Sequence, residues 1–305
     1  MIMNSGSIAT KLECCARPRW VGLITIQVIS LWLALSGDAT AAGGRVLATG
    51  GVTQLEGAAG GGLVPWAFIG GYGTRDEVGG TGVFTYIDTG DFNLRVIGGA
   101  IGLHDRLELS YARQHFDLGD TVPGESIEQD IFGAKLKLIG DAVFDQDRWW
   151  PQLAVGVQYK QNQDFDFVPA ALGAAHDSGV DYYLAATKLY LAGFFGRNVL
   201  INATVRATKA NQFGLLGFGG DRRDAYRPQF EGSAALFVTD ELAIGGEYRT
   251  RPDNLRVFAE NDIYDLFVAY VPNKHAALTV AYSDLGRIAD RTGQDAMYLS
   301  VQISF

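Results

Sequence analysis

Residues 297–305 alternate between apolar and polar side chains, which is the pattern of a β-strand with two different faces. One face carries Leu299, Val301, Ile303 and the terminal Phe305. An amphipathic strand that ends in an aromatic residue is typical of the closing strand of a Gram-negative outer-membrane barrel. We therefore expect these four residues to form the assembly signal, with the barrel assembly machinery as a partner.

The same alternation recurs in segments of about ten residues, the length that a tilted strand needs to cross a membrane. The clearest segments are 105–112, 150–160, 198–208, 226–238, 241–250, 262–271, 275–284 and 296–305. Weaker segments are 62–73, 79–88, 92–102, 128–139 and 181–192, and 45–54 is the least certain. The pattern predicts an all-β chain, a transmembrane antiparallel up-and-down β-barrel of fourteen strands with twelve as the alternative.

The connections between these segments differ in length. Long polar or glycine-rich connections alternate with short ones such as 103–104, 239–240 and 272–274. The long ones are 117–127, 161–180, 209–225, 251–261 and 285–295. Outer-membrane barrels have short periplasmic turns and long outer loops, so the asymmetry predicts a periplasmic amino terminus.

Tyrosines recur at one end of the predicted strands. Tyr111, Tyr159, Tyr248 and Tyr282 end outward-running strands, and Tyr226 and Tyr264 begin inward-running ones. Tyrosine can bury its ring among acyl chains and keep its hydroxyl among headgroups. These residues predict an aromatic girdle in contact with outer-membrane lipid and lipopolysaccharide.

The opposite faces of the strands are polar, and we expect them to line a water-filled lumen. A barrel of about fourteen strands is wide enough for such a lumen, whereas eight strands would fill with side chains. The expected pore-lining residues are Arg106, Glu108, Lys135, Lys137, Arg206, Arg227, Glu231, Glu247 and Arg249.

The beginning of the chain resembles an export signal. Lys11, Arg17 and Arg19 precede an apolar run over 20–35, and small residues follow it. We predict a cleaved signal peptide over 1–41 and a barrel over 42–305.

Composition excludes several classes of function. The formal net charge is −9, which disfavours a nucleic-acid partner because phosphate binding needs a concentrated basic surface. Both cysteines, Cys14 and Cys15, lie in the predicted leader, so the mature chain has no disulfide, thiol nucleophile or zinc-thiolate site. We expect no cofactor and no metal.

Two stretches carry a family resemblance. Residues 50–73, from Gly-Gly-Val-Thr-Gln-Leu-Glu-Gly to Phe-Ile-Gly-Gly-Tyr-Gly, together with 107–114, Leu-Glu-Leu-Ser-Tyr-Ala-Arg-Gln, resemble an exported family known only as domain of unknown function family 3034. The resemblance extends over most of the mature chain. It implies an outer-membrane-type barrel and carries no assigned activity or catalytic residue.

Other chemistry has weaker support. Ser110 and His115 could form part of a lipid-hydrolysing site at the outer rim, but a spacing of five places them on opposite faces of a strand. Asp164, Asp166 and Asp177 could bind calcium, although nothing in the sequence fixes their geometry. The glycine runs lack the lysine and the helix of a phosphate-binding loop.

The loops 161–180 and 209–225 mix apolar with polar residues, which is unusual for solvated loops. Either they fold into the mouth of the barrel and narrow it, or they pack on each other or on lipopolysaccharide.

The sequence favours a passive, porin-like channel for a small polar or amphipathic solute, not an enzyme. Two alternatives remain. One is a structural or adhesive barrel whose lumen is blocked by paired charges or by the glycine-rich amino-terminal segment. The other is a lipid-modifying enzyme that depends on His115.

Overall fold

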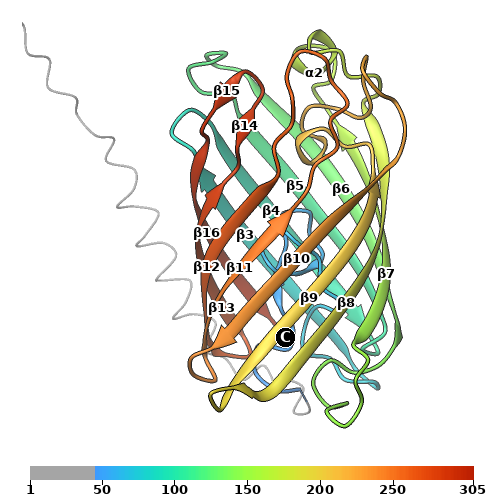
Figure 1. Cartoon of the computed structure of the whole chain (residues 1–305), viewed down its shortest axis with the longest axis vertical. Coiled ribbons are helices and arrows are strands. Elements are labelled where there is room, and N and C mark those ends of the chain that lie inside the picture. Colours follow the sequence, from blue (N-terminus) through green and yellow to red (C-terminus); the bar gives the residue numbers. More distant parts are fainter. Residues whose placement is uncertain (1–44) are drawn as a thin grey trace, which may run out of the picture. The chain divides into compact units, whose positions relative to one another are not determined.

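The computed structural model describes residues 45–305, which form a closed antiparallel β-barrel of twelve strands (Figure 1). The predicted signal peptide and its cleavage site lie outside the described residues. Each strand pairs with its neighbours in the chain, and β16 (Asp295–Ser304) closes the wall by pairing with β3 (Val78–Asp88). Among residues 45–305, no helix is long and apolar enough to cross a membrane.

The other wall strands follow in chain order. They are β4 (Asn93–Leu103), β5 (Leu107–Asp117), β6 (Ser126–Ile139), β7 (Gln152–Asn162), β8 (Ser178–Phe194), β9 (Arg197–Thr208), β10 (Arg227–Phe237), β11 (Leu242–Arg249), β12 (Ile263–Asn273) and β13 (Ala276–Asp284). We call the end that carries the connections 163–177, 209–226 and 250–262 the long-loop end, and the opposite end the short-turn end.

The all-β barrel is confirmed, but fourteen strands is wrong and the alternative of twelve is right. The two segments that fail are 45–54 and 62–73, which contribute nothing to the wall. They contain several glycines and lie inside the barrel, where backbone groups bond to wall side chains, as Gly51 O does to Gln302 and Ala67 N to Thr187. Weak alternation alone did not identify them, because the other weak segments 79–88, 92–102, 128–139 and 181–192 do form wall strands.

Side chains of the wall alternate between its two faces, with irregularities near the short-turn ends of β6, β8 and β12. In β12, Tyr264, Leu266 and Val268 are exposed on the outer face, whereas Asp265 and Phe267 are buried on the inner face. The period of two in sequence produces this division because successive side chains of a strand point to opposite sides.

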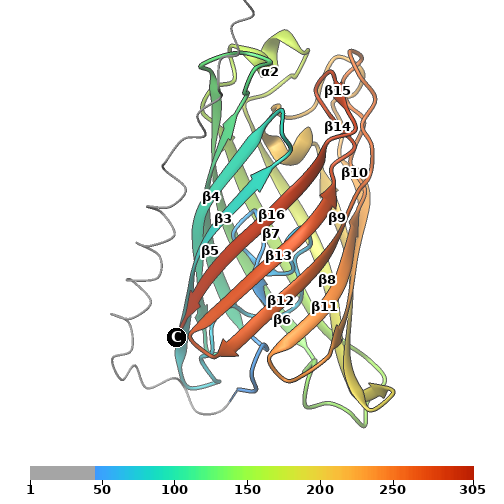
Figure 2. The same cartoon turned by 90° about the vertical axis from the view of Figure 1, so that its left-hand side faces the viewer.

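Residues 45–73, which we call the plug, fill the lumen from the short-turn end. Figures 1 and 2 both show this blue segment inside the barrel. It contains only two short strands, β1 (Val52–Thr53) and β2 (Ala59–Gly60), which pair with each other. Six of its large apolar side chains are almost completely buried: Leu55, Leu63, Val64, Trp66, Phe68 and Ile69.

The connections 209–226 and 250–262, which we call the cap, close the long-loop end. Leu215, Leu216 and Leu255 are buried in the same apolar cluster as Leu55 of the plug. The first connection contains the short helix η1 (Gln212–Gly214); the hairpin β14 (Arg287–Ile288) and β15 (Arg291–Thr292) lies nearby, since Gln212 bonds to Arg287 O. The loop 209–225 therefore enters the mouth.

The loop 161–180, which contains α2 (Val168–Ala171), packs on the cap. His176 bridges to Phe218, and an added Cβ on Gly217 would lie 3.1 Å from the Phe165 ring. The two alternatives for these loops are both realised in part, because the loops fill the mouth and also contact each other.

Where the plug leaves the lumen, its backbone lies close to β3 and to Phe305, at the junction where β3 and β16 close the barrel. Tyr72 N and Gly80 N both donate to Phe305 O, at 3.2 and 2.9 Å. A Cβ on Gly79 would lie 2.4 Å from Gly73 N and 2.8 Å from Tyr72 N, both backbone atoms that cannot move independently. Glycine is required there because of this approach.

We predict that Gly79→Ala destabilises the barrel by about 1–3 kcal/mol, the usual cost of forcing a methyl group into a packed site. The midpoint of urea unfolding of the purified protein in micelles measures this. Gly82→Ala is the matched control on the same strand, because its Cβ would meet only Ile303 Cγ1 at 3.5 Å. Equal midpoints for the two variants would contradict the assignment of this contact.

Candidate functional site: a charged cage at the tip of the plug

The tip of the plug is a tight turn that presents one carboxylate. Gln54 N donates to Ala58 O at 2.9 Å and Gly57 N donates to Gln54 O at 2.8 Å, with Gly57 at φ 90°. Only glycine adopts this conformation without strain. The turn places Glu56 at the tip, completely buried, and Gln54 Nε2 donates to its Oε2 at 2.7 Å.

Three wall cations surround Glu56. Lys160 of β7, Arg206 of β9 and Arg249 of β11 all lie near the long-loop ends of their strands and point inward. Arg249 donates to both carboxylate oxygens at 2.9 and 3.1 Å, and Arg206 Nη2 lies 3.2 Å from Oε2. Lys160 Nζ bonds to Oε1. We call these three residues the cation cage.

Two wall carboxylates hold the cage in place. Asp181 lies 2.7 Å from Lys160 Nζ and 3.3 Å from Arg206 Nη1. Glu231 accepts from Arg206 Nε at 2.5 Å and lies 3.3 Å from Arg249 Nε. Buried charges are tolerated only when they are paired and hydrogen-bonded, and here each cation contacts at least one wall carboxylate besides Glu56.

The cage keeps Glu56 ionised. Burial alone would raise the pKa of Glu56, but Arg206, Arg249 and Lys160 together hold that pKa well below the usual value of a glutamate. The plug tip therefore remains a carboxylate throughout the physiological pH range.

The cap contacts the cage from the other side. Lys160 Nζ donates to Phe213 O at 3.2 Å, and the Arg249 guanidinium lies 4.5 Å from the centre of the Phe213 ring. An arginine over an aromatic face is attracted to its π electrons. Plug and cap therefore meet at one charged layer that closes the lumen.

Below this layer the wall binds the backbone of the plug. Glu108 accepts from Ala59 N at 3.1 Å and from Gly70 N at 2.8 Å. Lys135, 3.1 Å from Glu108, donates to Ala59 O and Phe68 O. These contacts fix a plug whose only regular elements, within residues 45–73, are the short strands β1 and β2.

Further plug contacts come from other strands. Glu247 accepts from Leu63 N at 2.6 Å, Thr187 accepts from Ala67 N at 2.7 Å, and Trp66 Nε1 donates to Ser233 at 2.9 Å.

The nine predicted pore-lining residues divide into two groups. Six are buried on the inner face and contact the plug or the cage. They are Glu108, Lys135, Arg206, Glu231, Glu247 and Arg249. Arg106 and Arg227 are exposed at opposite ends of the wall, and Lys137 bonds to Asp105 at 2.6 Å at the short-turn end. Sequence reasoning missed Glu56 as a binding partner because it treated this region as part of the wall.

The six predicted girdle tyrosines are exposed on the outer face. Five lie near the long-loop end, whereas Tyr111 lies in the middle of β5, which extends to Asp117. Several hydroxyls bond to rim carboxylates, for example Tyr111 to Asp130 at 2.6 Å and Tyr264 to Asp284 at 2.8 Å. A second aromatic set at the short-turn end was missed. It comprises Phe144, Trp149, Trp150, Tyr190, Phe194 and Phe195, all exposed.

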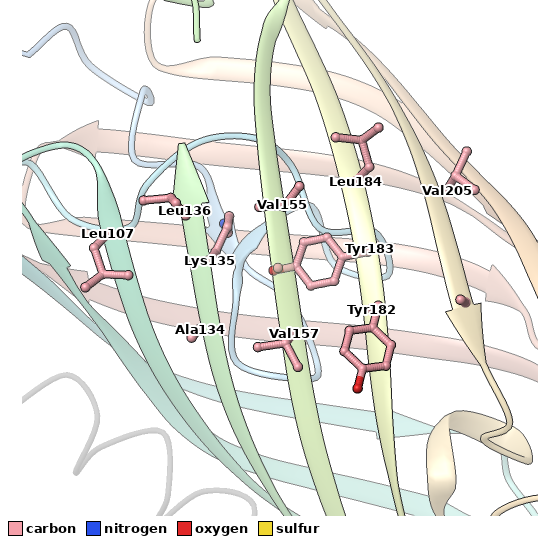
Figure 3. A pocket seen from close by; sticks show the side chains of 12 residues that line it. Leu107, Ala134, Lys135, Leu136, Val155, Val157, Tyr182, Tyr183, Leu184 and Val205 are labelled. Carbon is pink, nitrogen blue, oxygen red and sulfur yellow. The ribbon is translucent and has the colours of Figure 1, made fainter. Parts of the chain in front are cut away.

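The outer face between the two aromatic sets is apolar and contains a shallow hollow of about 740 Å³. Leu136, Val155, Val157 and Leu184 are among its lining side chains (Figure 3). The hollow lies over Ala134 and Ala207, whose short side chains leave space between their larger neighbours.

The weaker candidates form no catalytic or metal-binding group. Ser110 is buried on the inner face, whereas His115 lies on the other face, 3.4 Å from Glu128. Asp164 accepts from Glu128 N, and Asp177 accepts from Gln161. Within residues 45–305, no group of three or more His, Cys, Asp or Glu residues is placed to hold a metal ion.

The cap contains a buried acid with an altered pKa. Glu260 lies 3.4 Å from Arg251. Burial raises the pKa of Glu260 to about 7, a rise that nearby Asp253 adds to and that Arg251 and Gln212 offset only in part. Arg251 also donates to the carbonyls of residues 261, 285 and 287, so the cap retains this arginine when Glu260 is neutral.

We predict that the cap loosens as the pH rises. The pKa of Glu260 in the folded cap, about 7, exceeds its ordinary value of 4.5, so its stabilising contribution is complete below the ordinary value and is lost as the pH rises through about 7. Hydrogen exchange of residues 250–262, corrected for the intrinsic pH effect, should be faster at about pH 8 than at about pH 5. Glu260→Gln should remove the difference, whereas the exposed Glu241→Gln should keep it; a difference that persists in Glu260→Gln contradicts the assignment.

Three solved structures illustrate what the fold is similar to. A KdgM porin matches with a TM-score of 0.48 and 9% identity, over 74% of this chain and 99% of that chain. A NanC porin matches with a TM-score of 0.47 and 9% identity, over 74% and 98%. LpxR from Salmonella typhimurium matches with a TM-score of 0.43 and 13% identity, over 74% and 99%. These similarities concern the barrel fold alone.

No curated protein matches this chain. The family described as "Protein of unknown function (DUF3034)" matches over residues 49–302, which include most of the plug, the cage and nearly all of the wall. The resemblance in residues 50–73 and 107–114 is thus confirmed, and the chain belongs to this family.

Proposed function

We propose that this chain is an outer-membrane β-barrel that passes small polar or amphipathic solutes, and that the plugged arrangement is its closed state. The observation that carries the proposal is the attachment of the plug to the wall. The plug tip is held by ion pairs to charged side chains of the lumen, and the plug enters and leaves at the short-turn end only. Such a segment can withdraw as a unit without breaking a wall strand.

The outer face supports the location. Exposed leucine, isoleucine, valine and phenylalanine side chains cover the wall between two sets of aromatic residues, which is the surface that lipid requires of a membrane barrel. In this location the long loops face outward, lipopolysaccharide surrounds them, and the plug opens toward the periplasm. Phe305 and its strand then serve the assembly machinery.

The composition of the lumen supports transport over a purely mechanical role. Twelve strands enclose more space than their own side chains fill, since eight already suffice for a packed interior. The inner face nevertheless carries buried charges at the level of the plug tip, and buried ion pairs contribute less stability than apolar packing of the same volume. A lumen that is charged when the plug withdraws provides a polar path.

The complete occlusion by plug and cap also favours a second candidate, a structural barrel whose lumen never opens. In that case the cage acts only as a fastening for the plug. Electrical recording separates the two candidates because only the channel carries ions.

We predict that the wild-type protein in planar bilayers is closed for most of the time with brief openings, and that Glu56→Lys is open for much longer. A fourth cation inside the cage repels the other three, so the plug tip can no longer be held. Glu77→Lys is the matched control, because Glu77 is exposed before β3 and outside the cage.

Folding of each variant is checked by its heat-dependent mobility on gels, and the milder Glu56→Gln replaces Glu56→Lys where the latter does not fold. If neither the wild type nor the folded Glu56 variants carry current, the channel proposal is refuted and the structural barrel is the remaining candidate.

A further inference from the structure

We infer that the cation cage is a binding site for the carboxylate of a small amphipathic solute, and that Glu56 occupies this site in the closed state. The inference rests on the proposed function and identifies its solute class. In this view the plug is an internal competitor, and the solute opens the barrel by taking the place of Glu56.

The geometry of the cage is that of a carboxylate receptor. Arg249 meets the two oxygens of Glu56 with two separate N–H groups, at 2.9 and 3.1 Å. Paired donors of one guanidinium match the spacing of the oxygens in a carboxylate, which gives the contact its selectivity. Lys160 adds a third donor and Arg206 adds an ion pair at 3.2 Å, so the ligand group is held from three strands.

The charge of the cage also selects a monovalent anion. Its three cations face only two wall carboxylates, Asp181 and Glu231. One positive charge is therefore in excess when Glu56 is absent, and one carboxylate restores the balance. A neutral solute leaves that charge unpaired, at a high cost in a buried site.

The surroundings of the cage fit an apolar body on the same solute. The Phe213 ring lies 4.5 Å from the Arg249 guanidinium, and the Tyr183 ring lies 5.4 Å from that of Arg206. A small apolar cavity of about 40 Å³, lined in part by Leu55, Phe116 and Leu215, shares Phe213 with the cage on its long-loop side. A solute that approaches from that side thus presents its apolar part to the cap and its carboxylate to the cage.

Other buried charges of the inner wall are less suited to a carboxylate. Lys135 is already satisfied by Glu108 and two plug carbonyls. Glu247 and Asp265 are neighbouring carboxyl groups across β11 and β12 and provide no cation for a carboxylate ligand.

The competition is between a tethered and a free carboxylate. The tethered Glu56 carboxylate acts at an effective concentration in the millimolar range or above. A free solute must therefore be supplied at a concentration on the order of tens of millimolar to compete with it. Benzoate is a suitable probe because it combines a carboxylate with a flat apolar ring. Benzamide has the same shape without the charge and serves as the matched control.

The first experiment records the wild-type protein in a planar bilayer with about 0.1 M KCl, where screening extends over about 10 Å. Benzoate should increase the fraction of time spent open by roughly tenfold, which corresponds to about 1.4 kcal/mol, and benzamide should leave it unchanged. Equal effects of the two probes, or no effect of either while Glu56→Lys conducts, would overturn the inference.

The second experiment uses the ion selectivity of the opened barrel. In Glu56→Gln the cage keeps one unbalanced positive charge, so the reversal potential in a KCl gradient should shift toward that of chloride. Glu56→Gln/Arg249→Gln removes one charge of each sign, and this shift should be lost. A double variant that remains as selective for chloride as Glu56→Gln would show that the cage does not bind the anion.

The two proposals fail in different ways. Folded Glu56→Lys protein that carries no current refutes the channel itself. If Glu56→Lys conducts but the wild type responds to neither benzoate nor benzamide, the channel stands and the carboxylate site is refuted. The same conclusion follows if the current through Glu56→Gln is selective for potassium.

Discussion

The contact between Glu56 and the cation cage is the constraint on which the closed lumen depends. Lys160, Arg206 and Arg249 come from three separate strands, and their charges are buried. Removing one partner from such a cluster leaves an uncompensated charge, which is far more costly than the net gain from the intact pairs. The position of the plug tip is therefore fixed by electrostatics, and the rest of the plug must follow it.

The wall compensates for the lack of regular structure in the plug. A buried backbone needs a partner for each N–H and C=O group, and most proteins provide these partners within helices or sheets. Here side chains of the inner wall take this role, as Glu108 does for two amides and Lys135 for two carbonyls. Polar residues on the inner face thus bind the plug in the closed state and would meet water once it withdrew.

The sequence predicted the wall well for a simple physical reason. Lipid on one side and an enclosed interior on the other impose a period of two, and each of the twelve wall strands shows it. It also placed Glu108, Lys135, Arg206, Glu231, Glu247 and Arg249 on the inner face, where they are buried. Arg106, Lys137 and Arg227 fall at the same alternating positions, but they lie at the ends of the wall. Alternation predicts which face of the wall a side chain is on, and it does not predict the position of that side chain along the barrel axis.

The plug could not be found by the same reasoning. Segments 45–54 and 62–73 both mix glycine with apolar residues, so an approximate alternation arises there easily without a wall strand. The informative signal was the concentration of glycine, since Gly57 needs its positive φ at the tip and Gly79 approaches the backbone of Gly73. Glycine that allows close backbone approach is characteristic of a segment packed inside a crowded space.

An alternating pattern cannot distinguish a lumen filled with water from one filled with the chain's own backbone, because both require polar partners along the inner face. The distinction depends on contacts between residues far apart in the sequence, such as Glu56 with Arg249 and Leu63 with Glu247. Here several partners of the polar inner face belong to a segment that enters from one end, which favours an occupant that can be exchanged. In this barrel the exchange would begin at the cage, where the plug, the cap and the wall meet.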